Sequence, residues 1–148
     1  KSAAVPRSSP DGRYCLFTLA DFGQFHRWHT SSDLYVKDLV TGAITALAET
    51  NSPNVDSYHT WSSNGRWIVF SSRRDDGSYT RPYIAYFDKD GRGHKAFLLP
   101  QEDPEQNLRL TKSYNVPELT RDAVRTTAKQ LKECIYRDED TQTVKYVK

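Results

Sequence analysis

The residues best suited to chemistry lie in two loops. The first loop spans residues 21–33, reads "DFGQFHRWHTSSD" and holds two histidines around an arginine and a tryptophan: His26, Arg27, Trp28 and His29. A His-x-x-His spacing suits a metal ion or a carbohydrate ring, and His59 is the candidate for a third metal ligand. Packing at the rim of the fold is the competing interpretation. Because long loops on rigid scaffolds concentrate binding residues, this loop is the first candidate contact surface.

The second loop, "SSRRDDGSYTRPY" at residues 71–83, is rich in charge. Arg73 and Arg74 are followed directly by two aspartates, which favours solvated ion pairs within a hairpin loop. The functional alternative is a charged rim patch for an anionic partner. Tyr79 and Arg81 would be its anchors, because Tyr and Arg are enriched at interaction hot spots.

The motifs of several enzyme classes are missing from the sequence. It contains no G-x-S-x-G elbow, no glycine-rich phosphate loop and no H-E-x-x-H helix. The stretch "DKDGRG" at residues 88–93 imitates the start of a calcium loop, but Leu99 stands where the twelfth position requires a glutamate. A β-turn is the better interpretation. We predict no catalytic residue, no metal site and no cofactor.

Composition favours one ordinary domain rich in β-structure. The chain has 148 residues, enough to bury a core, and 12% of them are aromatic, a class that favours strands. A net charge of +2 with scattered basic residues gives no sign of a nucleic-acid partner. Cys15 and Cys134 match no zinc spacing and are either two thiols or one disulfide, with a buried Cys15 thiol favoured. No membrane-spanning run or targeting segment is visible.

One phrase occurs twice and indicates how the loops are positioned. "SPDGRYCLF" at residues 9–17 and "SSNGRWIVF" at residues 62–70 share a turn, a basic residue, an aromatic residue and an apolar run that ends in Phe. Asp-Gly and Asn-Gly suit a tight turn, and a short apolar run bounded by turn residues predicts a buried strand. Chance similarity of two unrelated hairpins is the alternative.

The similarity continues beyond these phrases. Tyr35-Val36 matches Tyr83-Ile84, each pair runs into a turn, and a further strand candidate follows at residues 43–47 and 95–99. Each unit therefore reads turn, strand, loop, strand, turn, strand. A period of roughly 40 to 50 residues with several strands per unit is typical of β-propeller blades.

At these residues the chain resembles the WD40-like repeats of the TolB family, also called PD40 repeats. Their signature is S-P-D-G-[KR]-aromatic-[ILV]-x-F, then an [IL]-[YW]-[VI] strand and a D-x-x-[TG]-G turn, which residues 9–17 match closely. In the second unit Trp61 precedes the turn and Asn64-Gly65 replaces Asp-Gly, a variant that the family accepts. Residues 61–88, with "FLLPQEDPEQN" and "KSYNVPEL", are similar to the closing region of TolB-like periplasmic proteins of Bacteroidetes-type bacteria.

We therefore expect a mainly β fold: two antiparallel propeller-type blades, about 8–53 and 54–100, followed by a C-terminal helix. Two blades cannot close a propeller, which takes about four to eight. Together with the absence of methionine, this suggests a piece of a longer propeller protein, or a unit completed by other copies or by its own tail.

The last third of the chain differs from the repeats. Residues 101–116 are polar and predict an extended connector, and apolar residues at helical spacing predict a helix from about residue 117 to 133. In residues 117–148 a final strand around Val144 and Tyr146 would cover a blade edge, with a frayed terminus as the alternative.

The resemblance implies a function without catalysis. TolB-like domains are binding scaffolds, so we expect a periplasmic module that engages a protein or cell-envelope ligand through its loops and blade edges, with self-association through exposed edges. Two alternatives stay open: a propeller-type hydrolase or lyase, or its accessory domain, using rim histidines, and a fragment that only completes a larger propeller.

Overall fold

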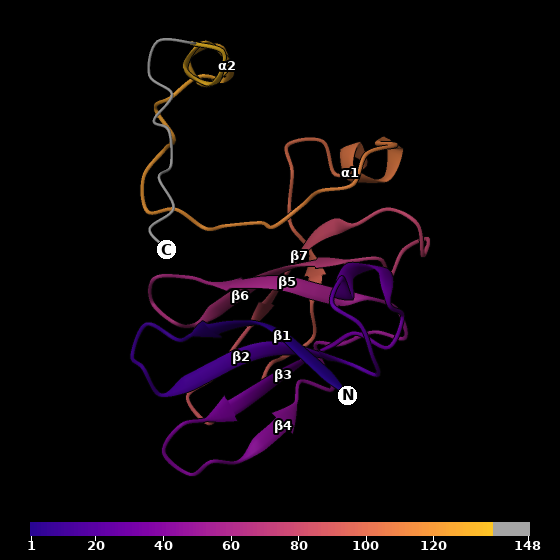
Figure 1. The fold of residues 1–148 in the computed structure, drawn as a ribbon, viewed down its shortest axis with the longest axis vertical. Helices are drawn as coiled ribbons and strands as arrows, with labels where there is room; N and C mark the ends of the chain where they lie inside the picture. The colour runs from indigo at the N-terminus through magenta and orange to yellow at the C-terminus, as the bar shows by residue number, and fades with distance from the viewer. Residues whose placement is uncertain (138–148) are drawn as a thin grey trace, which may run out of the picture.

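The computed structural model describes residues 1–137, which form two four-stranded antiparallel sheets (Figure 1). The first sheet has the order β1-β2-β3-β4, with β1 (Ser2–Ser8), β2 (Tyr14–Ala20), β3 (Asp33–Asp38) and β4 (Ile44–Ala46). The second has the order β5-β6-β7-β8, with β5 (Asp56–Trp61), β6 (Trp67–Ser72), β7 (Arg81–Tyr86) and β8 (Phe97–Leu98). Each strand pairs with its neighbour in sequence, so the predicted pair of antiparallel propeller-type blades is confirmed. The strands β1 and β5, which begin each sheet, were not predicted.

The repeated phrase forms the same turn in both sheets. Ser9 Oγ donates to Asp11 at 2.5 Å and accepts from the Tyr14 amide at 2.9 Å. In the second sheet Ser62 Oγ donates to Asn64 at 2.7 Å and accepts from the Trp67 amide at 2.9 Å. The glycine that ends each turn has a positive φ of 72° or 65°, a conformation that favours glycine. The sequence similarity therefore reflects equivalent local structure.

The core lies between the two sheets. Strand alternation sends Tyr14, Leu16 and Thr18 from β2 toward the second sheet, and all three are buried. The second sheet offers Ile68 and Phe70, which are fully buried. The apolar residues of this core come from both sheets: Tyr14, Leu16, Leu34, Val36, Leu47, Ile68, Phe70, Tyr83, Ala85, Phe87 and Ala96. Neither sheet alone encloses these side chains, so the two blades form one packing unit.

Equivalent aromatic residues have different surroundings because only one of them has a following sheet. Tyr14 is buried, with its ring edge-on to Phe87 at 5.2 Å. Trp67 faces the outer side of the second sheet, where it contacts Tyr86 and Phe97 at ring distances of 5.4 and 6.4 Å. No third sheet follows within residues 1–137. The exposed side of the second blade is thus the counterpart of the side that the first blade buries.

A strap, defined here as residues 113–118, crosses that outer side. Thr60 Oγ1 donates to the Pro117 carbonyl at 2.9 Å, and Ser71 Oγ donates to the Asn115 carbonyl at 2.5 Å. The Tyr114 amide donates to the Thr80 carbonyl at 2.9 Å. The Thr80 hydroxyl also donates to the Tyr114 carbonyl, so hydroxyl groups of Thr60, Ser71 and Thr80 hold the strap through its backbone.

The predicted helix from residue 117 to 133 is wrong in its extent. The helix α2 spans Ala128–Ile135, because Thr127 forms a capping box with Gln130 that fixes its start. The Pro117 carbonyl accepts a hydrogen bond from Thr60, so residue 117 belongs to the strap and not to the helix. The connector at 101–116 also contains a short helix, α1 (Gln106–Arg109), which was not predicted. α2 lies away from both sheets (Figure 1).

Three smaller expectations can be compared with the structure. Cys15 and Cys134 are free thiols, and Cys15 is half-buried on the side of β2 turned away from the second sheet, so it is not the fully buried core residue expected. The final strand expected around Val144 and Tyr146 lies outside the described residues. Within residues 1–137, no helix has the length and apolar character needed to cross a membrane.

His59 on β5 links the two sheets. Its Nε2 lies 3.0 Å from the Leu16 carbonyl and its Nδ1 lies 3.5 Å from Thr18 Oγ1, both on the first sheet. The side chain is fully buried, and this burial lowers the pKa of the imidazole from its ordinary 6.5 to about 4. Burial at this position therefore disfavours the protonated form of His59.

We predict that acid weakens the fold through His59. Below pH 6.5 the unfolded chain binds a proton that the folded chain refuses until about pH 4, so the free energy of unfolding falls as pH drops through this window, by about 3 kcal/mol in total. Urea unfolding at pH 7, 5.5 and 4 measures it. In His59→Gln this part of the loss should disappear, whereas His94→Gln, on a partly exposed turn, should keep it. An unchanged acid loss in His59→Gln would contradict the prediction.

Candidate binding site

The loop between β2 and β3 is fixed by a buried histidine. His26 begins the short 3-10 helix η1 (His26–Trp28) and is 1% exposed. Its Nε2 lies 3.3 Å from the Gly23 carbonyl, and its own carbonyl accepts a hydrogen bond of 2.6 Å from Ser32 Oγ. His29 packs edge-on against Phe22, with 4.7 Å between the rings. His26 therefore shapes the loop from inside and does not face solvent.

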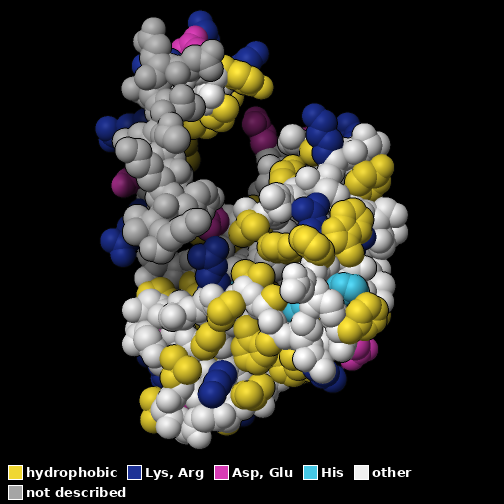
Figure 2. All heavy atoms as spheres, viewed as in Figure 1, with side chains coloured by type: hydrophobic (Ala, Val, Ile, Leu, Met, Phe, Trp, Pro, Cys, Tyr) yellow, Lys and Arg dark blue, Asp and Glu magenta, His cyan; other side chains and the backbone are white. Residues whose placement is uncertain are grey.

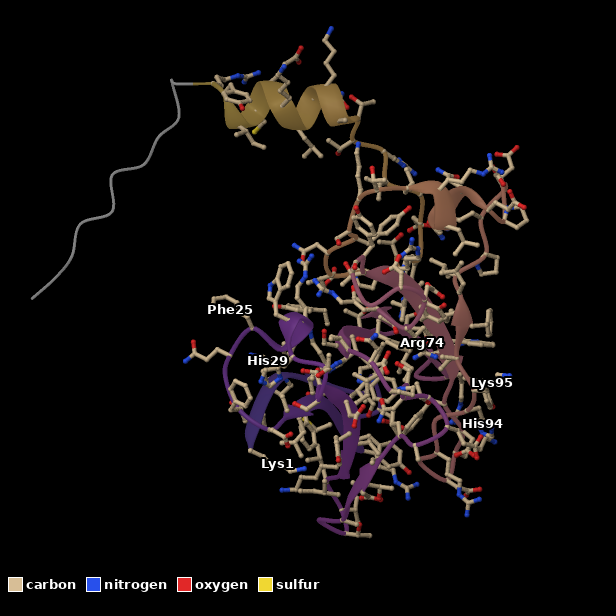
Figure 3. The ribbon with its side chains drawn as sticks, turned by 90° about the vertical axis from the view of Figure 1, so that its right-hand side faces the viewer. Lys1, Phe25, His29, Arg74, His94 and Lys95 are labelled. Carbon is tan, nitrogen blue, oxygen red and sulfur yellow. The ribbon has the colours of Figure 1, made fainter. Side chains whose placement is uncertain are left out.

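Three aromatic side chains project from the same loop into solvent. Phe22, Phe25 and Trp28 are 67, 70 and 64% exposed. Figure 2 shows apolar side chains around the histidines on this side of the molecule, and Figure 3 shows Phe25 at the outer side of the loop. Sequence reasoning selected Trp28 but missed the two phenylalanines. The sequence could have indicated both phenylalanines as exposed, because large apolar residues in a loop that lacks strand alternation are not directed into the core.

Two arginines lie against Trp28. The guanidinium carbon of Arg73, which follows β6, is 4.2 Å from the centre of the indole ring, and that of Arg27 is 5.7 Å from it. Arg27 Nη1 also donates to Asn115 Oδ1 of the strap at 3.1 Å. The structure thus brings three of the predicted residues together, at the point where the first blade's loop meets the second blade.

Arg74 points elsewhere. Its Nη2 pairs with the fully buried Asp56 at 2.8 Å and also donates to the Thr50 carbonyl at 2.8 Å, while its Nε donates to Ser72 Oγ at 2.9 Å. Its guanidinium carbon lies 4.4 Å from the centre of the Tyr83 ring. Figure 3 shows Arg74 among the side chains of the second sheet. The sequence predicted solvated pairs with the neighbouring Asp75 and Asp76, but Arg74 pairs with the buried Asp56 and so stabilises the fold. The two neighbouring aspartates lie against Arg81 instead.

Arg81 is a structural residue as well, which corrects its expected role as a rim anchor. It is 3% exposed, pairs with Asp76 at 2.7 Å and donates to the Asn107 carbonyl at 2.7 Å. Asp76 also accepts from the Tyr79 amide at 2.8 Å, so Tyr79 belongs to the same turn. Arg81 fastens α1 to the start of β7 and has almost no surface left for a partner.

The histidines do not assemble a metal site. His59 is sequestered between the sheets by its bonds to the first blade, and His26 is buried within its own loop. Among residues 1–137 no group of three or more His, Cys, Asp or Glu side chains could hold a metal ion. The rim-histidine arrangement that the enzyme alternative requires is not what the structure presents, since two of its three histidines are buried.

A separate apolar groove lies on the outer side of the second blade. It has a volume of about 400 Å³, and Trp67, Ile84, Phe97, Pro100 and Leu119 are among its lining residues. The groove lies beside the strap, which leaves this part of the sheet open. It lies on the surface that is equivalent to the buried side of the first blade.

Comparison with solved structures finds similarity to a β-propeller domain and to TolB. The β-propeller domain of the trilobed protease from Pyrococcus furiosus is 22% identical, with a TM-score of 0.46, over 68% of this chain and 30% of that one. TolB from Acinetobacter baumannii is 23% identical, with a TM-score of 0.42, over 64% of this chain and 21% of that one. The chain thus spans less than a third of either structure. No family model and no curated protein matches the sequence.

The two neighbouring arginines should differ in their contribution to stability. Arg74→Met leaves the carboxylate of Asp56 buried without its cation, which should lower the free energy of unfolding by about 3 to 5 kcal/mol. Arg73→Met loses only its stacking on Trp28 and should cost about 1 kcal/mol or less. Urea denaturation of both variants measures the difference. Equal losses would show that the contacts of Arg74 do not carry the energy assigned to them.

Proposed function

We propose that this chain is a non-catalytic binding module of the bacterial periplasm that holds a protein or cell-envelope ligand at the end of its two blades. The observation that carries the proposal is the aromatic cluster of Phe22, Phe25 and Trp28, exposed beside Arg27 and Arg73. Exposed large apolar groups in one loop cost solubility, and such patches mark interaction surfaces. We call these five residues the aromatic rim.

The support of the aromatic rim favours binding. Buried His26 and the Ser32 hydroxyl hold the loop from inside, and Arg73 stacks on Trp28 from the second blade. A surface ordered in advance loses less conformational entropy when a partner binds. Trp and Arg are also the residue types that most often dominate binding energy at protein interfaces. The rim therefore has the composition and the rigidity of a contact surface.

The periplasmic location and the class of ligand rest on the sequence. The repeated phrases at residues 9–17 and 62–70 resemble TolB-type repeats, whose proteins act at the cell envelope. The two-blade architecture agrees with that resemblance. A module completing a larger propeller would present the same rim, so both roles are compatible in one protein.

We expect a photo-crosslinking residue at Phe25 to capture the partner in the cells that make this chain. The matched control is Val40, which is 80% exposed in the turn between β3 and β4, at the opposite end of the first sheet. A discrete protein adduct, or an envelope component, should form from position 25 in the periplasmic fraction and not from position 40. Trp28→Ala should weaken binding of the identified partner at least tenfold, about 1.4 kcal/mol.

Three results would contradict this proposal. Adducts of equal yield from positions 25 and 40 would indicate unspecific contact. An absence of adducts from position 25 would remove the rim as the contact surface. Recovery of the chain in the cytoplasmic fraction would remove the periplasmic role.

A further inference from the structure

The helix α2 carries an apolar side that lies in solvent. Since each residue advances by about 100° around an α-helix, about one third of the circumference holds the apolar residues and the cysteine: Ala128, Leu131, Cys134 and Ile135. Leu131 is 51% and Ile135 is 77% exposed, and no residue of α2 is buried. Figure 2 shows apolar side chains over α2. Within residues 1–137 this side of the helix is therefore left uncovered.

A helix as short as α2 needs a surface to pack on. Isolated helices of this length are marginal in water, because the first turn fixes several residues for one hydrogen bond. The capping box of Thr127 and Gln130 satisfies only the first turn. In the described chain, every hydrogen bond and ion pair of residues 119–137 joins two residues of that same segment. Further stability of α2 has to come from burial of its apolar side.

The apolar groove on the second blade is an uncovered surface of the complementary kind. Its walls include the aromatic rings of Trp67 and Phe97, and Phe97 is 47% exposed. Leu119, the residue that directly follows the strap, also lines the groove. The chain therefore leaves the strap at the groove and continues from there to α2.

A short linker, residues 120–126, joins Leu119 to the N-cap of α2 at Thr127. Because Thr60 donates a hydrogen bond to the Pro117 carbonyl, the start of this linker is held beside the second blade. A linker of this length spans roughly 25 Å when extended, which allows the helix to return to the groove. A short tether also gives α2 an effective concentration of roughly millimolar at the groove, which favours it over a free peptide or a second copy of the chain.

We propose that the groove is a docking site for an amphipathic helix, and that α2 of the same chain folds back and places its apolar side in it. The arrangement in Figure 1, with α2 away from both sheets, is then the open one. Docking buries Leu131 and Ile135 against the aromatic walls of the groove. The inference goes beyond the proposed function, because no residue of the aromatic rim lines the groove.

Docking in this orientation turns the polar side of α2 to solvent. That side consists of Lys129, Gln130, Lys132 and Glu133. Arrays of stacked repeats need an end that presents a polar outer face, because the last repeat otherwise exposes the surface that its neighbours bury. No third sheet follows the second blade within residues 1–137. α2 would take the place of that sheet on the part of the blade that the strap leaves uncovered.

The native Cys134, a free thiol beside the apolar side of α2, allows docking to be tested by disulfide trapping in the full chain. Cys15→Ser removes the other thiol, and Pro100→Cys places a new one on the wall of the groove. The matched control is Val40→Cys, at a position that is 80% exposed in the turn between β3 and β4. Under mild oxidation at low protein concentration, residues 100 and 134 of one chain should pair roughly tenfold faster than residues 40 and 134. Peptide mapping by mass spectrometry identifies the products.

A second pair of variants tests which side of α2 docks. Leu131→Ser removes the centre of the apolar side, so the disulfide between residues 100 and 134 should form roughly fivefold more slowly or less, and the amides of α2 should exchange faster with solvent. Lys129→Ser lies on the opposite side of the helix and loses a similar helix propensity, so it should leave both measurements unchanged.

Three outcomes would overturn the proposal. Equal rates from positions 40 and 100 would show that α2 meets every surface alike. Disulfides that join two chains, at a rate that rises with protein concentration, would make a second copy the occupant of the groove. Equal effects of Leu131→Ser and Lys129→Ser would remove the apolar side of α2 as the docking surface.

Discussion

Each four-stranded sheet of this chain has two sides, and only one side of each packs against the other sheet. This contact buries Leu16, Ile68 and Phe70 and encloses His59 between the blades, where burial lowers the pKa of its ring. Every other feature depends on that contact, because it sets how the loop after β2 reaches the second blade. Without it Trp28 and Arg73, which lie far apart in the sequence, would not meet.

The sides turned away from this contact explain the unusual surfaces. Strand alternation puts Trp67, Val69, Ser71 and Arg73 on the outer side of the second blade, equivalent to the buried side of the first. The strap covers part of it through hydroxyl bonds from Thr60, Ser71 and Thr80 to its backbone. The apolar groove lies on the part of this side that the strap does not cover. Beside the strap, Nε and Nη2 of Arg73 have no hydrogen-bond acceptor among residues 1–137. Both follow from the same lack of a third sheet among residues 1–137.

The sequence was sufficient for the strands with strong local signals and insufficient for the rest. The repeated turn phrases predicted β2 and β6, because Asp-Gly and Asn-Gly chemistry is local. The strands β1 and β5 escaped because each carries a bulge, with positive φ at the equivalent residues Val5 and Tyr58, which interrupts alternation. The helix was placed too early because helical spacing from residue 117 could not reveal the contact of Pro117 with Thr60.

In the candidate site, too, the sequence could not predict the different contacts of two neighbouring residues, Arg73 and Arg74. Arg73 and Arg74 are indistinguishable in composition and in local sequence, yet consecutive residues of an extended chain point to opposite sides. Arg74 pairs with the buried Asp56, which is the first residue of β5. Arg73 stacks on Trp28, and its Nε and Nη2 are buried without a hydrogen-bond partner among residues 1–137. A non-local partner, which only the folded chain supplies, thus decides which arginine forms a buried ion pair and which stacks on Trp28.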